Sequence, residues 1–381
     1  MPNNHAKLSA SGSAQWINCP GSIKATAGII GTSSVFAEEG SAAHELAEIC
    51  LNGGALASAL VGQRLVEWDD WTVTEEMAGY VQQYIDFVIA LGGTQSYEIR
   101  SDFSAWVPDG FGTSDAVAYV ADTKTLHVVD LKYGQGIRVD AENNSQGILY
   151  ALGVFDSMYL SHEIDRVVIT IVQPRLGHID EWTIDVDTLL KCGEIISQAA
   201  DRALADDAPR IPGETQCRWC DAKATCPALL ELTETTMMAE FDNLDAVPVD
   251  SLTDAQMALA LDNKKLILSW FDAISQKVKD RLMSGQPFAG YKMVAGNRSR
   301  SWAYDDADVV SRLAHDFGVT SDDAYISKIV SPAQAEKLVG KKHAPSIASM
   351  IQTKEGSPTL VIDSDKRPAV TVSLDDFEDL T

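Results

Sequence analysis

The stretch Val128-Val129-Asp130-Leu131-Lys132-Tyr133-Gly134 is the part of the sequence on which the predicted fold and site depend. Its β-branched apolar run predicts a buried strand, which ends in a carboxylate, an apolar residue and an amine before a glycine turn. Asp130 and Lys132 are two positions apart, so a strand projects both from the same face. Because buried charges must be paired or bind a metal, the two residues form either a strand-end salt bridge or a metal carboxylate beside a cation that handles a nucleophile or a phosphate.

Two further strands are predicted upstream, over residues 96–103 and 111–120. Each is separated from the next by a short connection, and the third strand runs over residues 126–133. Short links of this kind predict an antiparallel meander.

The meander brings acidic residues together. Asp115 on the second strand is expected to lie beside Asp130 on the third. Two neighbouring carboxylates repel each other unless a divalent cation bridges them or one is protonated. Glu98, on the first strand, is either a third carboxylate of this group or a residue that orients it; the alternatives are a pair with Arg100 or an exposed edge charge.

The region before the strands reads as helical. Ser41 can cap a helix, which places His44 one turn into it, and residues 45–93 continue in helices. A histidine in this position is either structural or solvated, or it is a metal ligand or a phosphate contact.

After the glycine turn the pattern predicts a helix over residues 142–159, a buried strand over 166–174 that stops at a proline, an edge strand over 181–186 and a helix over 189–204. Gln146 is four residues before Tyr150, so one helical face carries an amide and a phenol. Directly after the strand of Asp130, these two groups can position a substrate or the lysine.

A metal knuckle is predicted from three closely spaced cysteines beside turn residues, Cys217, Cys220 and Cys226. Zinc would accept Cys19, a histidine or an aspartate as the fourth ligand, whereas an iron–sulfur cluster wants a fourth thiolate. Cys19 is the best candidate, because the following Pro20-Gly21 turn leaves its thiol at a loop edge. Cys50 and Cys192 lie in apolar helical contexts and are less suited.

Composition limits the function classes. The 381 residues carry a formal charge of −25 and are 45% hydrophobic, which is typical of a soluble globular protein and argues against a broad basic surface for nucleic acid. A local basic groove stays compatible with this charge. No signal peptide or membrane span is recognised, so a cytoplasmic location is expected.

The C-terminal part changes in character. Residues 250–284 predict an amphipathic helix or a pair of helices, residues 290–302 a basic strand, and residues 304–350 further helices. The basic strand is either a solvated hairpin or a contact for nucleic-acid backbone. Residues 353–381 are acidic and are predicted to be a largely disordered tail.

One order of residues resembles a known family. It runs Cys19, His44, Glu98, Asp115, Asp130-Leu131-Lys132, Gln146-x-x-x-Tyr150, Cys217, Cys220 and Cys226. It resembles the RecB-like branch of the PD-(D/E)XK nuclease superfamily, in the form with an iron–sulfur cluster that AddB-type recombination nucleases and CRISPR-adaptation exonucleases carry. The second acid of this pattern is often glutamate and is Asp130 here. The overall layout also resembles an uncharacterised family found largely in phages and prophages.

The resemblance implies an α/β fold with a restriction-endonuclease-like core, in which helices flank a mixed central sheet. It further implies an N-terminal helical insertion, an iron–sulfur knuckle and a mostly helical C-terminal extension. The corresponding division is a nuclease domain over residues 1–232, an α-rich extension over 233–352 and the tail over 353–381.

The resemblance also implies roles for residues. Mg²⁺ or Mn²⁺ would be held by His44, Asp115, Asp130 and the carbonyl of Leu131, while Lys132 orients or activates water or stabilises charge on the phosphate. Gln146 and Tyr150 would position the scissile strand, with Glu98 counted among the catalytic residues. Cys19, Cys217, Cys220 and Cys226 would hold a structural 4Fe–4S cluster, with zinc as the alternative.

The expected function is a metal-dependent exonuclease that acts on single-stranded DNA or DNA ends in phage recombination or DNA processing, in the cytoplasm of an infected or lysogenic bacterial host. The alternatives are a non-catalytic cluster-containing DNA-end-binding scaffold and a zinc-stabilised protein-interaction module. Expected partners are DNA, a single-strand annealing or binding protein that docks on the acidic tail, and further copies of the chain in a homo-oligomer; no membrane partner is expected.

Overall fold

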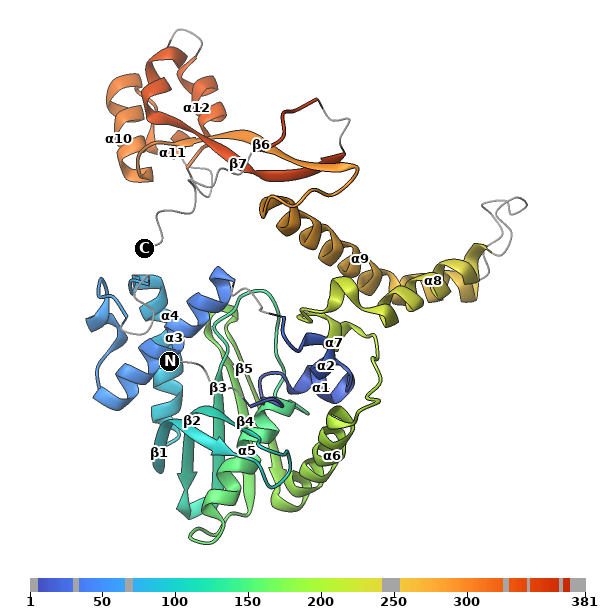
Figure 1. Cartoon of the computed structure of the whole chain (residues 1–381). Coiled ribbons are helices and arrows are strands. Elements are labelled where there is room, and N and C mark those ends of the chain that lie inside the picture. Colours follow the sequence, from blue (N-terminus) through green and yellow to red (C-terminus); the bar gives the residue numbers. More distant parts are fainter. Residues whose placement is uncertain are drawn as a thin grey trace. The chain divides into compact units, whose positions relative to one another are not determined.

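A computed structural model of the chain describes residues 6–29, 34–65, 71–241, 254–324, 329–340, 343–362 and 366–370 (Figure 1). They belong to two compact units, residues 1–270 and residues 271–381. The predicted nuclease domain, residues 1–232, lies within the first unit, which also contains the following helix and the first part of a long helix. None of the helices in the described part of the chain is both long and apolar enough to span a membrane.

The first unit is built on a five-stranded mixed sheet with the strand order β1-β2-β3-β4-β5. Only the contact between β3 and β4 is parallel; the other neighbours are antiparallel. The predicted meander, the buried fourth strand and the edge strand are therefore confirmed. The strands are β1 (Thr94–Asp102), β2 (Phe111–Val120), β3 (Thr125–Leu131), β4 (Arg166–Gln173) and β5 (His178–Asp185).

The parallel pair is joined by α5 (Ser145–Met158), as a crossover between parallel strands requires. The Asn144 side chain accepts a hydrogen bond of 3.0 Å from the Gly147 N–H and so caps the helix. This cap sets the helical positions of Gln146 and Tyr150 relative to the end of β3.

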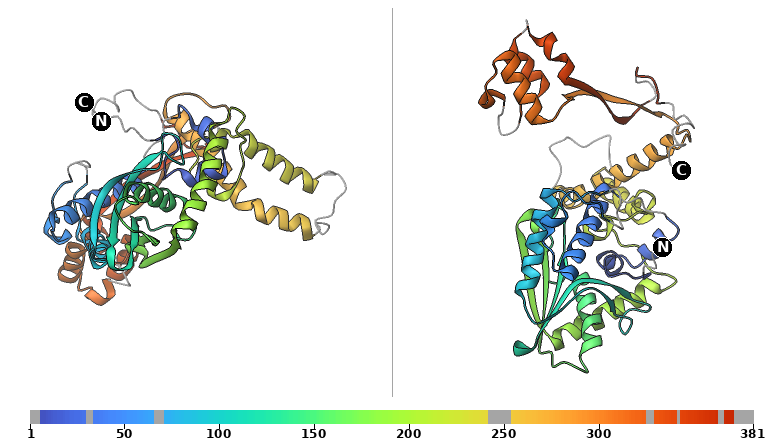
Figure 2. Two further views of the ribbon diagram at one scale, coloured as in Figure 1. Left: turned by 90° about the horizontal axis from the view of Figure 1, so that it is seen from below. Right: turned by 90° about the vertical axis from the view of Figure 1, so that its left-hand side faces the viewer.

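Helices cover both faces of the sheet (Figures 1 and 2). On one face, Leu126 and Val128 of β3 belong to a core shared with α5 and α6 (Val186–Leu204). On the other face, Val129 and Leu131 belong to a core shared with α3 (Val35–Gly53) and α4 (Glu75–Ala90). Since both faces are buried, the apolar runs of the central strands are nearly continuous rather than alternating.

The start of α3 differs from the prediction. The Ser34 side chain accepts a hydrogen bond of 3.2 Å from the Ala37 N–H and caps the helix, so α3 begins at Val35. Ser41 lies inside the helix, and its hydroxyl donates to the Ala37 carbonyl. The expectation that Ser41 starts the helix is therefore wrong, because an earlier serine provides the cap, and His44 lies in the third turn.

The N-terminal segment packs beside α5 and α6. Trp16 of α1 (Ser13–Asn18) is buried in the core that these helices share. The remaining helices of the first unit are α2 (Ser22–Thr26), α7 (Glu214–Cys217), α8 (Pro227–Phe241), the first part of α9 (Asp254–Met283), and the short 3₁₀ helices η1 (Ala57–Leu60), η2 (Ala121–Thr123), η3 (Pro174–Leu176) and η4 (Lys223–Thr225).

The second unit contains the rest of α9 and a two-stranded antiparallel sheet. Apolar residues such as Val309, Leu313 and Ile347 form its core. Its elements are β6 (Tyr291–Trp302), α10 (Asp306–Phe317), α11 (Ser321–Ala324), α12 (Pro332–Val339), η6 (Ala344–Met350) and β7 (Ile351–Ile362). The strand predicted over 290–302 and the helices predicted over 250–284 and 304–350 are thus present.

The predicted disordered tail is wrong over its first ten residues. Residues 353–362 form most of β7, whose end pairs with residues 291–294 of β6. The β-branched and apolar residues 359–362 favour this pairing over disorder. Residues 371–381, the end of the predicted acidic tail and docking segment, lie outside the described residues.

Candidate functional site

Three carboxylates occupy one row across three neighbouring strands. In the β1–β2 register, Tyr97 is opposite Ala116 and Ile99 is opposite Ser114, so Glu98 faces Asp115. The β2–β3 register ends with Ala116 opposite Val129, so Asp115 and Asp130 are the next opposed positions. The expected neighbourhood of Asp115 and Asp130 is therefore confirmed, with Glu98 on the far side of Asp115.

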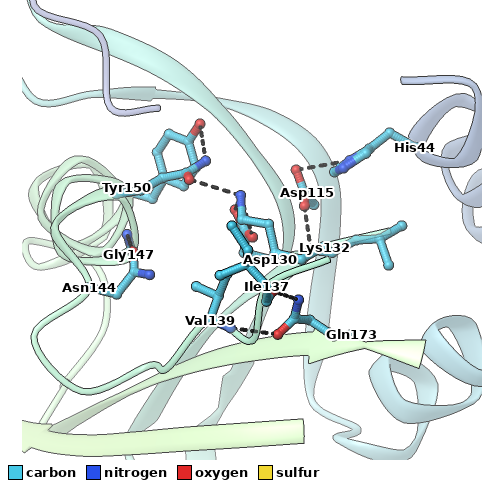
Figure 3. Close-up of polar contacts among 12 residues, drawn as sticks. His44, Asp115, Asp130, Lys132, Ile137, Val139, Asn144, Gly147, Tyr150 and Gln173 are labelled. Carbon is cyan, nitrogen blue, oxygen red and sulfur yellow. Dashed lines mark hydrogen bonds and ion pairs between the residues drawn. The ribbon is translucent and has the colours of Figure 1, made fainter. Parts of the chain in front are cut away.

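Asp115 is held from two directions (Figure 3). Its Oδ1 lies 3.4 Å from Nδ1 of His44, which α3 carries over the sheet. Its Oδ2 accepts a hydrogen bond of 2.7 Å from the N–H of Leu131. The contact of Leu131 in this structure is thus through its N–H, whereas the resemblance implied its carbonyl.

Glu98 completes a group of three possible ligands. One ligand atom each of His44, Glu98 and Asp115 lie within 4.8 Å of one another. Glu98 has a φ of 47°, which is uncommon for a residue with a side chain and is a form of backbone strain that occurs at functional sites. Its alternative partner, Arg100, lies with its guanidinium carbon 4.0 Å from the centre of the Phe111 ring.

The buried carboxylate of Asp130 faces Lys132. Asp130 is only 2% exposed, and the Lys132 ammonium lies 3.1 Å from its Oδ1 and 2.8 Å from its Oδ2. Oδ2 nevertheless accepts no hydrogen bond of acceptable geometry. A buried oxygen with an unused lone pair is a suitable position for a cation.

The amide and the phenol predicted to share a helical face continue this chain of contacts (Figure 3). The Lys132 ammonium donates to Oε1 of Gln146 over 2.9 Å, and Nε2 of Gln146 donates to the hydroxyl of Tyr150 over 3.3 Å. One polar chain therefore runs from the end of β3 to the second turn of α5.

A glycine on β2 makes room for the phenol. A Cβ atom on Gly112 would lie 2.7 Å from Cε1 of Tyr150, closer than real contacts allow. The sequence signal was the glycine within a strand, which indicates a close approach to the backbone. The Tyr150 ring is the group that makes this approach.

Burial and mutual repulsion shift the pKa values of the site. Burial would lower the pKa of His44, but the carboxylates of Asp115 and Asp130 outweigh burial and raise it to about 9. Burial and the neighbouring Asp115 raise the pKa of Glu98 to about 8. Burial also raises the pKa of Asp130 despite Lys132, whereas His44, Lys132 and the Leu131 N–H lower the pKa of Asp115 against the effect of burial.

These residues fit a divalent cation. Three carboxyl groups are opposed by at most two positive side chains, His44 and Lys132, so the site carries a net negative charge once all three are ionised. Carboxylate oxygens suit Mg²⁺ and Mn²⁺, and imidazole is a further ligand for transition metals. A cation at this place would offset both burial and the repulsion from Asp115 that raise the pKa of Glu98, and it would give Oδ2 of Asp130 a partner besides the Lys132 ammonium.

The four predicted cysteine ligands line one small cavity, where Cys19 meets the segment of Cys217, Cys220 and Cys226. The Ile211 N–H donates to Sγ of Cys19 over 3.3 Å, which connects the Cys19 turn to the chain just before Cys217. No three of these four thiols, all within the described chain, lie within 4.8 Å of one another. Cys50 is buried among α3 and α4, as its apolar context predicted.

Two polar residues of the site region were missed by the sequence analysis. Gln173, at the end of β4, donates to the Ile137 carbonyl over 2.9 Å and accepts from the Val139 N–H over 2.7 Å (Figure 3). Arg175 lies 2.8 Å from Glu39 of α3 and stacks over the ring of Tyr133. The sequence did contain a signal for Gln173: this polar residue ends the apolar run of β4, just as Asp130 interrupts the apolar run near the end of β3.

Comparison with known proteins gives two findings. Residues 5–368 match a family described as "Protein of unknown function (DUF2800)". The chain is also similar to a solved structure described as "Crystal structure of SSO0001", at 14% sequence identity and a TM-score of 0.25. That match covers 57% of this chain and 85% of the other, and at these values it establishes neither fold nor function.

Proposed function

The chain belongs to the DUF2800 family of unknown function, and we propose that it is a metal-dependent DNA exonuclease with a PD-(D/E)XK core. It would hydrolyse phosphodiester bonds in single-stranded DNA or at DNA ends, in phage recombination or DNA processing. The observation that carries the proposal is the row of Glu98, Asp115 and Asp130, with the ammonium of Lys132 beside it.

The bound cation would be Mg²⁺ or Mn²⁺, with Asp115, Asp130, His44 and the Leu131 carbonyl as its ligands and Glu98 close by. When bound, it supplies the positive charge that lowers the pKa of a bound water and neutralises the charge that develops on the phosphate.

Lys132 would act as a fixed positive charge. Its pKa is raised, because Asp130 and Asp115 outweigh the effect of burial. An ammonium has three N–H donors, of which Asp130 and Gln146 occupy two. The third is available to a phosphate oxygen or to the attacking water, so Lys132 is suited to orienting water and stabilising charge rather than to accepting a proton.

The contacts of Lys132 also orient the next two groups. An ammonium can only donate, so Gln146 turns its oxygen toward Lys132 and its NH₂ toward Tyr150. The Tyr150 oxygen therefore accepts from Gln146, and its own O–H remains available to donate. A phosphate oxygen of the scissile strand is the acceptor that we assign to it.

The cysteines would hold a 4Fe–4S cluster with a structural role. A single zinc ion with Zn–S distances of about 2.3 Å brings its sulfur ligands to within roughly 4 Å of one another. The described thiols are not grouped this closely, and a cluster of iron and sulfide holds its cysteines further apart. The expected sign is a brown protein that loses its colour in Cys19→Ser and Cys226→Ser but keeps it in Cys192→Ser, whereas a zinc protein is colourless throughout.

The test of the enzyme is degradation of end-labelled single- and double-stranded DNA by anaerobically purified protein with Mg²⁺ or Mn²⁺. Asp130→Ala and Lys132→Ala are expected to abolish cleavage while folding and colour are kept. Asp122→Ala, an exposed aspartate in the β2–β3 connection, is the matched control and should cleave as the unaltered protein does. A brown, folded protein that binds DNA ends tightly without cutting would replace this proposal with the non-catalytic scaffold.

A further inference from the structure

One tryptophan lies at the surface of the cysteine knuckle. Trp219, between Cys217 and Cys220, is 79% exposed. Among the described tryptophans it is the one exposed residue; Trp16, for comparison, is 1% exposed and belongs to the core. A tryptophan gains more from burial than almost any other side chain, so this exposure needs a reason beyond folding.

The turn that carries Trp219 is fixed by its own contacts. The Cys220 N–H donates to the Cys217 carbonyl, and the Lys223 ammonium donates to the Arg218 carbonyl over 2.9 Å. The same ammonium donates to the hydroxyl of Ser269 on α9 over 3.1 Å. Cys217 and Ala222 are buried on the inner side of the segment. The ring of Trp219 is therefore presented on a rigid turn and not on a flexible loop.

Positive charge accompanies the exposed ring. Arg218 precedes Trp219, and Arg210 is one of the residues that line the cavity of the four cysteines. Neither guanidinium has an ion-pair partner among the residues that the structure describes, in contrast to Arg175, which is paired with Glu39. In a chain of formal charge −25, an exposed indole preceded by one unpaired arginine, on a knuckle whose cavity a second arginine lines, favours a partner that is both anionic and flat.

We propose that Arg218 and Trp219 bind single-stranded DNA, with a base stacked on the indole and phosphates contacted by Arg218 and Arg210. Exposed aromatic side chains flanked by cations are the usual contact of unpaired bases, because every base has a face that can stack. Bases of a duplex are already stacked on one another, so this contact selects single strands. The inference rests on the proposed function and narrows its substrate to DNA with an unpaired stretch.

The knuckle is connected to the candidate site through the N-terminal segment. Cys19 follows directly after α1, and Ser13 at the start of α1 is hydrogen-bonded to Ser145 at the start of α5. Gln146 is the next residue. A DNA strand bound at the knuckle would therefore contact a segment that is connected, through the Ser13–Ser145 hydrogen bond, to the helix that carries Gln146 and Tyr150.

The test measures binding of a fluorescein-labelled oligothymidylate by the full-length, cluster-containing protein, in EDTA so that no cleavage occurs. Trp219→Ala is expected to weaken binding about tenfold, in line with the loss of one base–aromatic stack, whereas Trp219→Phe retains most of the affinity. Arg218→Ala should weaken binding and reduce its salt dependence. Tyr159→Ala is the aromatic control. Tyr159 is exposed and directly follows the C-terminal end of α5, whereas Gln146 lies at the N-terminal end of that helix.

A second readout is the quenching of tryptophan emission by iodide. The difference in quenching between the unaltered protein and Trp219→Phe reports how accessible Trp219 is to iodide. We expect oligothymidylate, but not blunt-ended duplex DNA, to reduce this accessibility. Unchanged affinity in Trp219→Ala, together with no protection of Trp219 by oligothymidylate in the unaltered protein, would overturn the inference while leaving cleavage, and hence the proposed function, intact. The inference would also be overturned if Trp219→Ala changed the self-association of the protein, measured by sedimentation, but not its affinity for DNA. Absence of any DNA binding or cleavage by the unaltered protein would remove both proposals.

Discussion

The hydroxyls of Ser13 and Ser145 lie 2.6 Å apart, although 132 residues separate them in the chain. Ser13 is the first residue of α1, which leads to Cys19, and Ser145 is the first residue of α5, which carries Gln146 and Tyr150. This hydrogen bond therefore joins α1, the helix that precedes Cys19, to α5, the helix whose Gln146 contacts the Lys132 ammonium.

Ser13→Ala is expected to destabilise the first unit. Ser13 is 1% exposed but Ser145 is partly exposed, so the loss is expected to be about 1 kcal/mol, the net contribution of one hydrogen bond. Urea unfolding followed by circular dichroism measures the change. The double variant with Ser145→Ala should lose less than the sum of the two single changes, and strict additivity would show that the bond contributes nothing.

Gly112→Ala is expected to displace the Tyr150 ring, because the new methyl group would lie 2.7 Å from it. The expected loss of stability is about 1–3 kcal/mol, and cleavage should fall more than Mn²⁺ affinity, since no proposed ligand is altered. Thermal unfolding, DNA cleavage and Mn²⁺ titration are compared on one preparation. Gly79→Ala is the matched control: nothing lies near its Cβ position within α4, so stability should be unchanged or slightly higher. Equal behaviour of the two variants would contradict the assigned role of Gly112.

Glu98→Gln is expected to have opposite effects on the metal-free and the metal-bound protein. It removes a carboxyl group that must take up a proton on folding at neutral pH, because burial and Asp115 raise its pKa to about 8, so the metal-free protein becomes more stable. It also removes a candidate ligand, so the rise in melting temperature on addition of Mn²⁺ becomes smaller. Differential scanning calorimetry with and without Mn²⁺ measures both. A variant that is stabilised by Mn²⁺ as much as the unaltered protein would exclude Glu98 from the cation site.

The pKa values of Glu98 and His44 predict how stability depends on pH without metal. Folding raises the pKa of Glu98 from 4.5 to about 8 and that of His44 from 6.5 to about 9. In both cases the native state binds its proton more tightly than the unfolded chain does. The contribution of Glu98 to the free energy of unfolding is complete below pH 4.5 and is lost as the pH rises through about 8. That of His44 is complete below pH 6.5 and is lost as the pH rises through about 9.

The free energy of unfolding of the metal-free protein is therefore expected to fall between pH 6.5 and 9. Urea unfolding in EDTA at several pH values in this range measures it, and His44→Gln should make the dependence shallower. Saturating Mn²⁺ should flatten it, because a cation takes the place of the protons. A stability that rises over this range would contradict the assigned charge balance.

Local patterns determined much of the first unit. The buried strands, the antiparallel meander and α5 follow from the period of apolar residues, the short connections and the turn residues, all of which act within a few positions. Because the connection between β2 and β3 is short, the pattern was also sufficient to place Asp115 beside Asp130. The clustering of Cys19 with the later cysteines was predicted from the need of a metal site for a fourth ligand, together with the Pro20-Gly21 turn that leaves the Cys19 thiol at a loop edge.

Other features were decided by the tertiary structure. Either Ser34 or Ser41 is locally able to cap a helix, and only the folded chain selects Ser34. The strand at 351–362 exists because β6, far away in sequence, supplies its hydrogen-bond partners. No local pattern predicts the positive φ of Glu98. The approach of the Tyr150 ring to Gly112 likewise depends on how α5 packs against β2. Periodicity specifies which face of an element is buried, whereas packing of distant elements specifies which side chains meet there.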